Sequence, residues 1–121
     1  AEHGLGQLAA GRGDNVQARQ HLLRAVRLAP TDEKIRNDLG VTYLSLGELE
    51  KARFEFLTAI ELKDSDRLAA VNLVTLLLYQ DKWQQAADLV SRFGLSADQF
   101  NEAQARAEQL KPGGVQPPRS S

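Results

Sequence analysis

The chain has 121 residues, of which 42% are hydrophobic and 26% charged, so it is long enough for one hydrophobic core and has the composition of a globular protein. Fifteen Lys and Arg residues against sixteen Asp and Glu leave a net charge of -1, which disfavours a strongly basic nucleic-acid binder. There is no cysteine, which excludes disulfide scaffolds and thiol nucleophiles. The longest apolar run, Leu68 to Tyr79, is too short to span a bilayer.

The sequence matches itself at an offset of 34 residues. Small residues recur at three sets of equivalent positions: Gly6 and Gly40; Gly13 and Gly47; Ala18, Ala52 and Ala86. Larger apolar residues recur at a fourth set: Leu22, Phe56 and Val90. Such a period is typical of stacked pairs of antiparallel helices, with small residues where the two helices of a pair approach closely. The turn within each pair is expected at Gly13, Gly47 and, one period later, Asp81.

Seven helices are predicted in chain order, over about residues 1–11, 15–28, 33–46, 49–62, 67–80, 83–93 and 97–110. Thr31 or Asp32 is expected to cap the third helix, and Ser65 or Asp66 the fifth. Ser96 with Gln99 forms a capping-box pattern that opens the seventh helix. That last helix is expected to cap the array, and residues 111–121, rich in proline and glycine, to form a disordered tail.

The middle repeat resembles the tetratricopeptide repeat family through Leu39-Gly40, Tyr43, Gly47, Ala52, Phe56 and Ala59. The resemblance implies an all-α, right-handed solenoid of three helix pairs plus a C-terminal capping helix. The predicted domain covers residues 1–110, with repeats at about 1–32, 33–66 and 67–98. The resemblance further implies a protein-binding module rather than an enzyme. Arg36 and Ala70 stand where the family carries its early tryptophan.

No catalytic, cofactor-binding or metal-binding residue is predicted. Gly4-Leu5-Gly6 fits a loose dinucleotide fingerprint but has no strand before it. Arg12-Gly13-Asp14 matches an adhesion tripeptide, although the repeat already accounts for its glycine. His3 and His21 fall on different helices without metal-ligand spacing.

The first helix of each pair lines the concave face of this architecture, and family geometry identifies the side chains that point inward. We expect a partner-binding groove formed by Asn37, Val41, Leu44, Leu68, Val71, Asn72, Thr75, Leu78 and Tyr79. The helix over residues 67–80 is apolar nearly all round, so its inward side chains require a partner. That partner is either a segment of another protein or, alternatively, the seventh helix or the tail of this chain.

The predicted groove suits an apolar or amphipathic segment, with Asn37 and Asn72 holding its backbone. Some family members clamp a C-terminal carboxylate with a positive cluster at these positions. Here those positions read His3, Gln7, Asp38, Leu68 and Asn72, so no such clamp is expected.

The chain also resembles, more narrowly, the TadD-type lipoproteins of bacterial tight-adherence (Flp) pilus systems. This resemblance rests on three stretches: Arg36–Val41, Leu46-Gly47 and Ala70–Leu73. Those proteins are periplasmic, anchored by lipid to the outer membrane, and act as pilotins for a secretin. The resemblance implies the C-terminal segment of a secretin as partner, and a processed chain whose lipid anchor lay upstream. Alternatives are a cytoplasmic scaffold or secretion chaperone, a regulatory domain of a larger enzyme, and two copies stacking through the uncapped first repeat.

Overall fold

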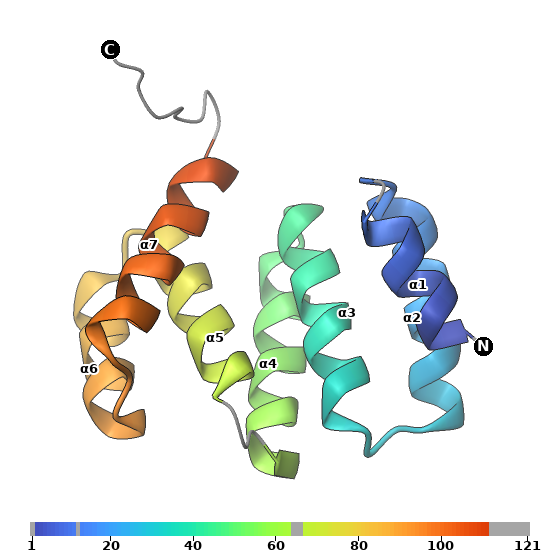
Figure 1. The fold of residues 1–121 in the computed structure, drawn as a ribbon, viewed down its shortest axis with the longest axis horizontal. Helices are drawn as coiled ribbons and strands as arrows, with labels where there is room; N and C mark the ends of the chain where they lie inside the picture. The colour runs from blue at the N-terminus through green and yellow to red at the C-terminus, as the bar shows by residue number, and fades with distance from the viewer. Residues whose placement is uncertain (1, 12, 64–66, 112–121) are drawn as a thin grey trace. The chain divides into compact units, whose positions relative to one another are not determined.

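The computed structural model describes residues 2–11, 13–63 and 67–111, and this part of the chain contains helices and no strand. The seven helices are α1 (Glu2–Gly11), α2 (Asn15–Leu28), α3 (Glu33–Ser45), α4 (Leu49–Lys63), α5 (Leu68–Tyr79), α6 (Trp83–Phe93) and α7 (Ala97–Leu110). The all-α expectation is confirmed, and each helix begins and ends within one residue of its predicted bounds (Figure 1).

The chain divides into two compact units, Ala1–Ala69 and Ala70–Ser121. In the first unit α1 packs against α2, α2 against α3, and α3 against α4. Glycine permits the closest approaches within each pair. A Cβ added at Gly6 would lie 2.7 Å from Cγ of Leu22, and one at Gly40 would lie 2.5 Å from Cε1 of Phe56. The core therefore fills each glycine gap with one large side chain that is fully buried.

An ion pair joins the two helices of the second pair, and the same arginine also contacts the loop between the first and second pairs. Arg36 on α3 donates from Nη1 to Oε1 of Glu55 on α4 at 3.0 Å, and from Nε to the carbonyl oxygen of Pro30 at 3.0 Å. Glu55 is 7% exposed, so the guanidinium is the partner that permits its burial. The charged residue at the position of the missing tryptophan thus has a structural role of its own.

The turns within the helix pairs share one backbone conformation. Gly13 and Gly47 have φ angles of 79° and 78°, and Asp81, one period further along, has 60°. All three lie in the left-handed region, where glycine is unstrained and aspartate is tolerated better than most side chains. The sequence period therefore identifies the turn even where its glycine is replaced.

The second unit contains α6, α7 and all of α5 except its first two residues. The predicted capping box is confirmed, because Ser96 accepts from the Gln99 backbone N–H while the Gln99 side chain accepts from the Ser96 N–H. Ala103 and Ala107 of α7 are buried, whereas Glu102 and Glu108 on the other side of the helix are exposed. Helix α7 therefore lies against the unit through a narrow stripe of small residues, as predicted for a capping helix.

Asp32 is the N-cap of α3, since its carboxylate accepts from the backbone N–H groups of Lys34 and Ile35. The alternative caps expected for α5, Ser65 and Asp66, and the tail beyond Lys111 lie outside the described residues. None of the helices in the described part of the chain combines the length and the apolar character that a membrane span requires.

Candidate functional site

The nine predicted groove residues differ widely in exposure. Leu68, at the start of α5, is 56% exposed, and Asn37, Val41 and Tyr79 are half-buried. The remaining five are buried in the chain itself: Leu44, Val71, Asn72, Thr75 and Leu78. These five side chains therefore do not line an open groove in the structure described, and their role in binding a partner stays a prediction.

Helix geometry explains the burial of the leucines. Leu44 follows Gly40 by one turn, and residues four apart share a helix face. Gly40 packs against Phe56 of α4, so Leu44 lies on the face of α3 that is turned toward its own helix pair, and it is 4% exposed. Leu78 stands in the same relation to Val74, which is fully buried, and is itself 1% exposed.

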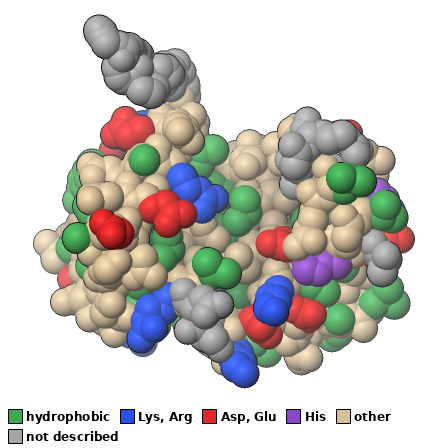
Figure 2. All heavy atoms as spheres, in the orientation of Figure 1, with side chains coloured by type: hydrophobic (Ala, Val, Ile, Leu, Met, Phe, Trp, Pro, Cys, Tyr) green, Lys and Arg blue, Asp and Glu red, His purple; other side chains and the backbone are tan. Residues whose placement is uncertain are grey.

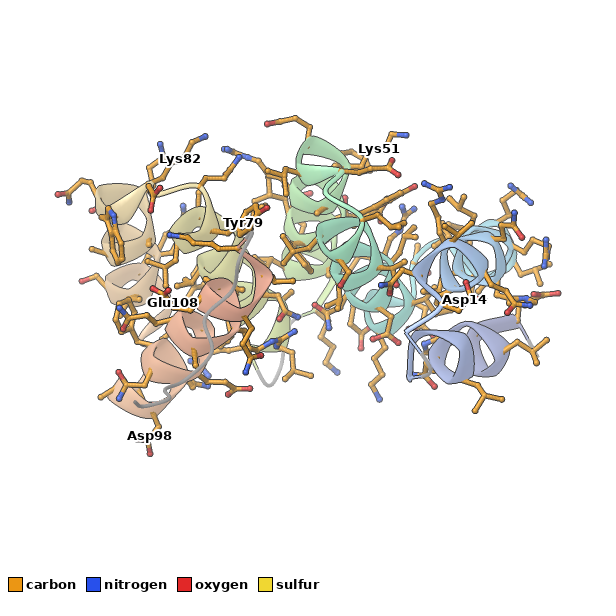
Figure 3. The ribbon with its side chains drawn as sticks, turned by 90° about the horizontal axis from the view of Figure 1, so that it is seen from above. Asp14, Lys51, Tyr79, Lys82, Asp98 and Glu108 are labelled. Carbon is orange, nitrogen blue, oxygen red and sulfur yellow. The ribbon has the colours of Figure 1, made fainter. Side chains whose placement is uncertain are left out.

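Helix α7 meets the inward face of α5. The guanidinium of Arg106 donates from Nη1 to Oδ1 of Asn72 at 3.1 Å. At the end of the same helix, Lys111 forms an ion pair with Asp81 at 3.1 Å. Figures 1 and 3 show α7 lying alongside α5 and α6, with Tyr79 and Lys82 at the junction of α5 and α6. The seventh helix thus occupies part of the surface where a partner was expected from the sequence. It was one of the alternative occupants named there.

The first unit presents a different surface, built by α1 and α3. His3 on α1 places Nε2 2.6 Å from Oδ2 of Asp38 on α3. Gln7, one turn further along α1, donates from Nε2 to the same oxygen at 2.9 Å. All three side chains retain solvent access, so this cluster is a polar surface feature and not part of the core.

The rest of this surface comes from one stripe of α3. Asn37, Val41 and Ser45 follow one another at intervals of four residues and so share a face, and Lys34 precedes them by one turn. Lys34 and Ser45 are exposed, while Asn37 and Val41 are half-buried. We call these residues, with His3, Gln7 and Asp38, the α1–α3 face. Figure 2 shows histidine, acidic and basic side chains gathered over these two helices.

Two further interactions hold α1 in place. Oε1 of Glu2 lies 2.7 Å from Nδ1 of His21 and 3.2 Å from Nε of Arg24, both on α2. The hydrogen bond to His21 is the main reason that the pKa of Glu2 lies below its usual value, and Arg24 adds to it. Helix α1 is therefore fastened by polar groups on two sides, toward α2 and toward α3.

The described residues contain no group of three or more His, Cys, Asp or Glu side chains arranged to hold a metal ion. Gly4, Leu5 and Gly6 lie within α1, and Gly6 packs against Leu22 instead of opening a phosphate-binding loop. Arg12 of the adhesion tripeptide lies outside the described residues. Binding through polar and modest apolar contacts is thus the chemistry that the α1–α3 face can offer.

The sequence pattern missed the contact between Asn72 and Arg106, although it contained a signal for it. The 34-residue offset that aligns Asp38 with Asn72 continues to Arg106. The three residues therefore occupy one register position on α3, α5 and α7. Arg106 lies beyond the third predicted repeat, which ends at about residue 98, so the repeats as predicted did not include it.

Residues 9–77 of the chain match the sequence model of the family described as tetratricopeptide repeat. Among curated proteins, a TPR repeat-containing protein of Pseudomonas aeruginosa is 46% identical to the chain over 107 residues. The alignment covers 88% of this chain and 44% of that protein. The chain therefore spans less than half the length of the relative it matches.

Proposed function

The chain belongs to the tetratricopeptide repeat family, and on that premise we propose that it binds a segment of a partner protein on the α1–α3 face. Proteins of this family are in general non-enzymatic scaffolds for protein–protein interaction. The observation that carries the choice of surface is a difference in accessibility. The inward side chains of α3 at Asn37 and Val41 remain half-exposed, whereas those of α5 at Val71 and Thr75 are buried.

The chemistry of this face suits a polar or mixed peptide segment more than a purely apolar one. Val41 is the apolar contact at its centre, and Asn37 lies one turn before it. A side-chain amide carries both a donor and an acceptor, so Asn37 adds polar character to this face. Asp38 already accepts hydrogen bonds from α1, and Lys34 adds a positive charge at one end. The partner segment is therefore expected to carry an apolar side chain flanked by backbone or acidic groups.

The finer proposal is that the chain acts as a pilotin-like assembly factor for the secretin of a bacterial tight-adherence pilus. The residues from Arg36 to Val41 and from Ala70 to Leu73 support it through their likeness to the lipoproteins of those systems. On this proposal the partner is the C-terminal segment of the secretin, and the protein works at the periplasmic face of the outer membrane. Asn37, Asp38 and Val41 belong both to the similar stretch and to the α1–α3 face.

The proposal is tested by titrating the purified chain with a fluorescent peptide of the C-terminal segment of the secretin from the same organism. We expect saturable binding that weakens at least about tenfold in Val41→Asp, because a charge replaces the central apolar contact. Leu57→Asp is the matched control, since Leu57 is 40% exposed on α4 and lies outside the α1–α3 face. Circular dichroism establishes that both variants fold.

Three outcomes are distinguished. Loss of binding in Val41→Asp with retention in Leu57→Asp supports both the face and the partner. Equal binding by the two variants overturns the α1–α3 face as the site. Absence of secretin binding by the unaltered chain overturns the pilotin-like role. A generic bacterial scaffold or secretion chaperone, acting in the cytoplasm, then becomes the better account.

A further inference from the structure

The outward side of α4 carries two large apolar side chains that remain in water. Phe54 is 62% exposed and Leu57 is 40% exposed. The buried side of the same helix is formed by Ala52, Phe56 and Ala59, which are 0%, 0% and 1% exposed. With about 3.6 residues in each turn, positions 54 and 57 fall on the side of the helix opposite to these three. Figure 3 shows α3 and α4 side by side, with Lys51 of α4 labelled. Phe54 and Leu57 are therefore directed away from the core of their own helix pair.

This exposed apolar pair is particular to the second repeat. One period earlier the two positions hold Gln20 and Leu23, and one period later they hold Asp88 and Ser91. Phe54 thus stands where each of the other repeats carries an exposed polar side chain. Helix α4 follows α3 and precedes α5, so the exposure does not arise at an end of the chain. The repeat pattern therefore gives no structural reason for a phenylalanine at this position.

Two acidic residues extend the apolar pair along the helix in both directions. Residues at intervals of four, three and four share one face of a helix, and this spacing joins Glu50, Phe54, Leu57 and Glu61. We call these four residues the α4 stripe. Both glutamates are exposed, and the neighbouring Lys51 is paired with Glu48 at 3.1 Å. The α4 stripe therefore presents two apolar side chains between two negative charges.

We propose that the α4 stripe binds an amphipathic helix of a partner protein, in which two apolar side chains lie between two basic ones. The charges select this occupant. A lysine or arginine at each end of the bound helix meets Glu50 and Glu61, while its apolar side chains cover Phe54 and Leu57. A second copy of the chain is disfavoured, because both the parallel and the antiparallel arrangement of two stripes place glutamate opposite glutamate. An anionic membrane surface is disfavoured for the same reason.

This second contact is independent of the α1–α3 face. That face is formed by residues of α1 and α3, whereas all four residues of the α4 stripe belong to α4 and face away from the core of the pair. The two surfaces also differ in charge, since the α1–α3 face contains Lys34 and His3 besides Asp38. Failure of one site in a binding experiment therefore leaves the other unaffected.

The probe is a fluorescent helical peptide of about 18 residues, built on alanine and glutamine, with lysine, leucine, leucine and lysine at the spacing of the α4 stripe. Titration of the whole chain into the peptide is followed by fluorescence anisotropy. We expect saturable binding with a Kd below about 1 mM, weakened at least about fivefold in Phe54→Gln. Val16→Gln is the matched control, since Val16 is 51% exposed on α2. Circular dichroism establishes that both variants fold.

The charges are tested by reversal. Glu61→Lys is expected to weaken binding of the probe at least about fivefold, because a lysine then faces a lysine. A second probe, with glutamate in place of one lysine, is expected to restore binding to Glu61→Lys. Glu108→Lys, at an exposed site of α7, changes the net charge of the chain equally and is expected to bind the first probe as the unaltered chain does.

Equal binding of the first probe by Phe54→Gln and the unaltered chain would overturn the proposal, as would no binding up to about 1 mM. Binding that Phe54→Gln weakens but Glu61→Lys leaves unchanged would overturn the basic character of the partner. Sedimentation velocity of the unaltered chain supplies the remaining outcome. A dimer that Phe54→Gln dissociates would assign the α4 stripe to a second copy and overturn a partner helix as its occupant.

Discussion

Helices α3 and α5 occupy the same place in successive repeats, yet the structure uses them differently. Asp38 and Asn72 stand at one register position, but Asp38 is bonded by the preceding helix α1 and Asn72 by the following helix α7. The inward face of α3 remains partly open, while that of α5 is buried. A repeat position is thus not a fixed environment, because the neighbour that reaches it decides whether it serves binding or packing.

The two helices also differ in how they meet their own partners. Gly40 on α3 leaves space that Phe56 fills, with a would-be Cβ only 2.5 Å from the ring. At the same positions of the next repeat stand Val74 and Val90. The glycine and phenylalanine of the second repeat are thus replaced by two valines in the third. The repeat keeps the summed volume of the two side chains and not their types.

The substitution with the largest predicted effect disrupts the contact between Gly40 and Phe56 in the second repeat. We expect Gly40→Val to lower the free energy of unfolding by about 2 kcal/mol or more, because the fully buried Phe56 ring has no room to move away. Urea unfolding followed by circular dichroism measures the change. Gly4→Ala is the control, since nothing lies within 4 Å of a Cβ there, and a gain of up to about 1 kcal/mol is expected from helix propensity.

The same measurement tests whether volume alone is the cause. Combining Gly40→Val with Phe56→Val copies the residue pair of the third repeat. The double variant is expected to recover at least half of the stability lost by Gly40→Val alone. If the two losses simply add, the rule of conserved volume does not hold for this pair.

A medium effect is expected where α7 meets α5. Arg106→Ala removes the hydrogen bond to the buried Asn72 and is expected to cost about 1.5 kcal/mol. Hydrogen exchange should show faster amide exchange in α7, with little change in α1 to α4. Glu102→Ala, at an exposed site of the same helix, serves as the control. Unchanged protection of α7 in Arg106→Ala would show that the alanine stripe alone holds the helix.

The sequence predicted the helices well because period, turn residues and caps all act locally. Asp32, Ser96 and the turn glycines determine backbone conformation through groups only a few residues away. The candidate groove was predicted less well because exposure is a tertiary property. The apolar character of Leu78 indicates that it needs cover, but not whether that cover comes from this chain or from a partner. The polar contact between Asp38 and α1 depends equally on packing between repeats.

The smallest predicted effect concerns acid stability and also distinguishes the two repeats. Glu48, at the turn between α3 and α4, pairs with Lys51 at 3.1 Å and with Arg19, whereas the equivalent position of the next repeat is Lys82. The hydrogen bond to Lys51 is the main reason that the pKa of Glu48 lies below its usual value of 4.5, and the charges of Lys51 and Arg19 add to it.

Because the folded state holds this carboxylate more acidic than the unfolded state does, its stabilising contribution is complete above pH 4.5 and is lost as the pH falls through the lowered pKa. Glu48→Gln is therefore expected to flatten the fall of the urea midpoint on the acid side, and to leave its slope near neutral pH unchanged. Glu50→Gln, at an exposed site of α4, is the matched control. An equal acid slope in Glu48→Gln and in the unaltered chain would assign the acid sensitivity to other carboxylates. A flattened slope would assign the acid sensitivity to the turn between α3 and α4, where Glu48 stands at the position that Lys82 occupies in the third repeat.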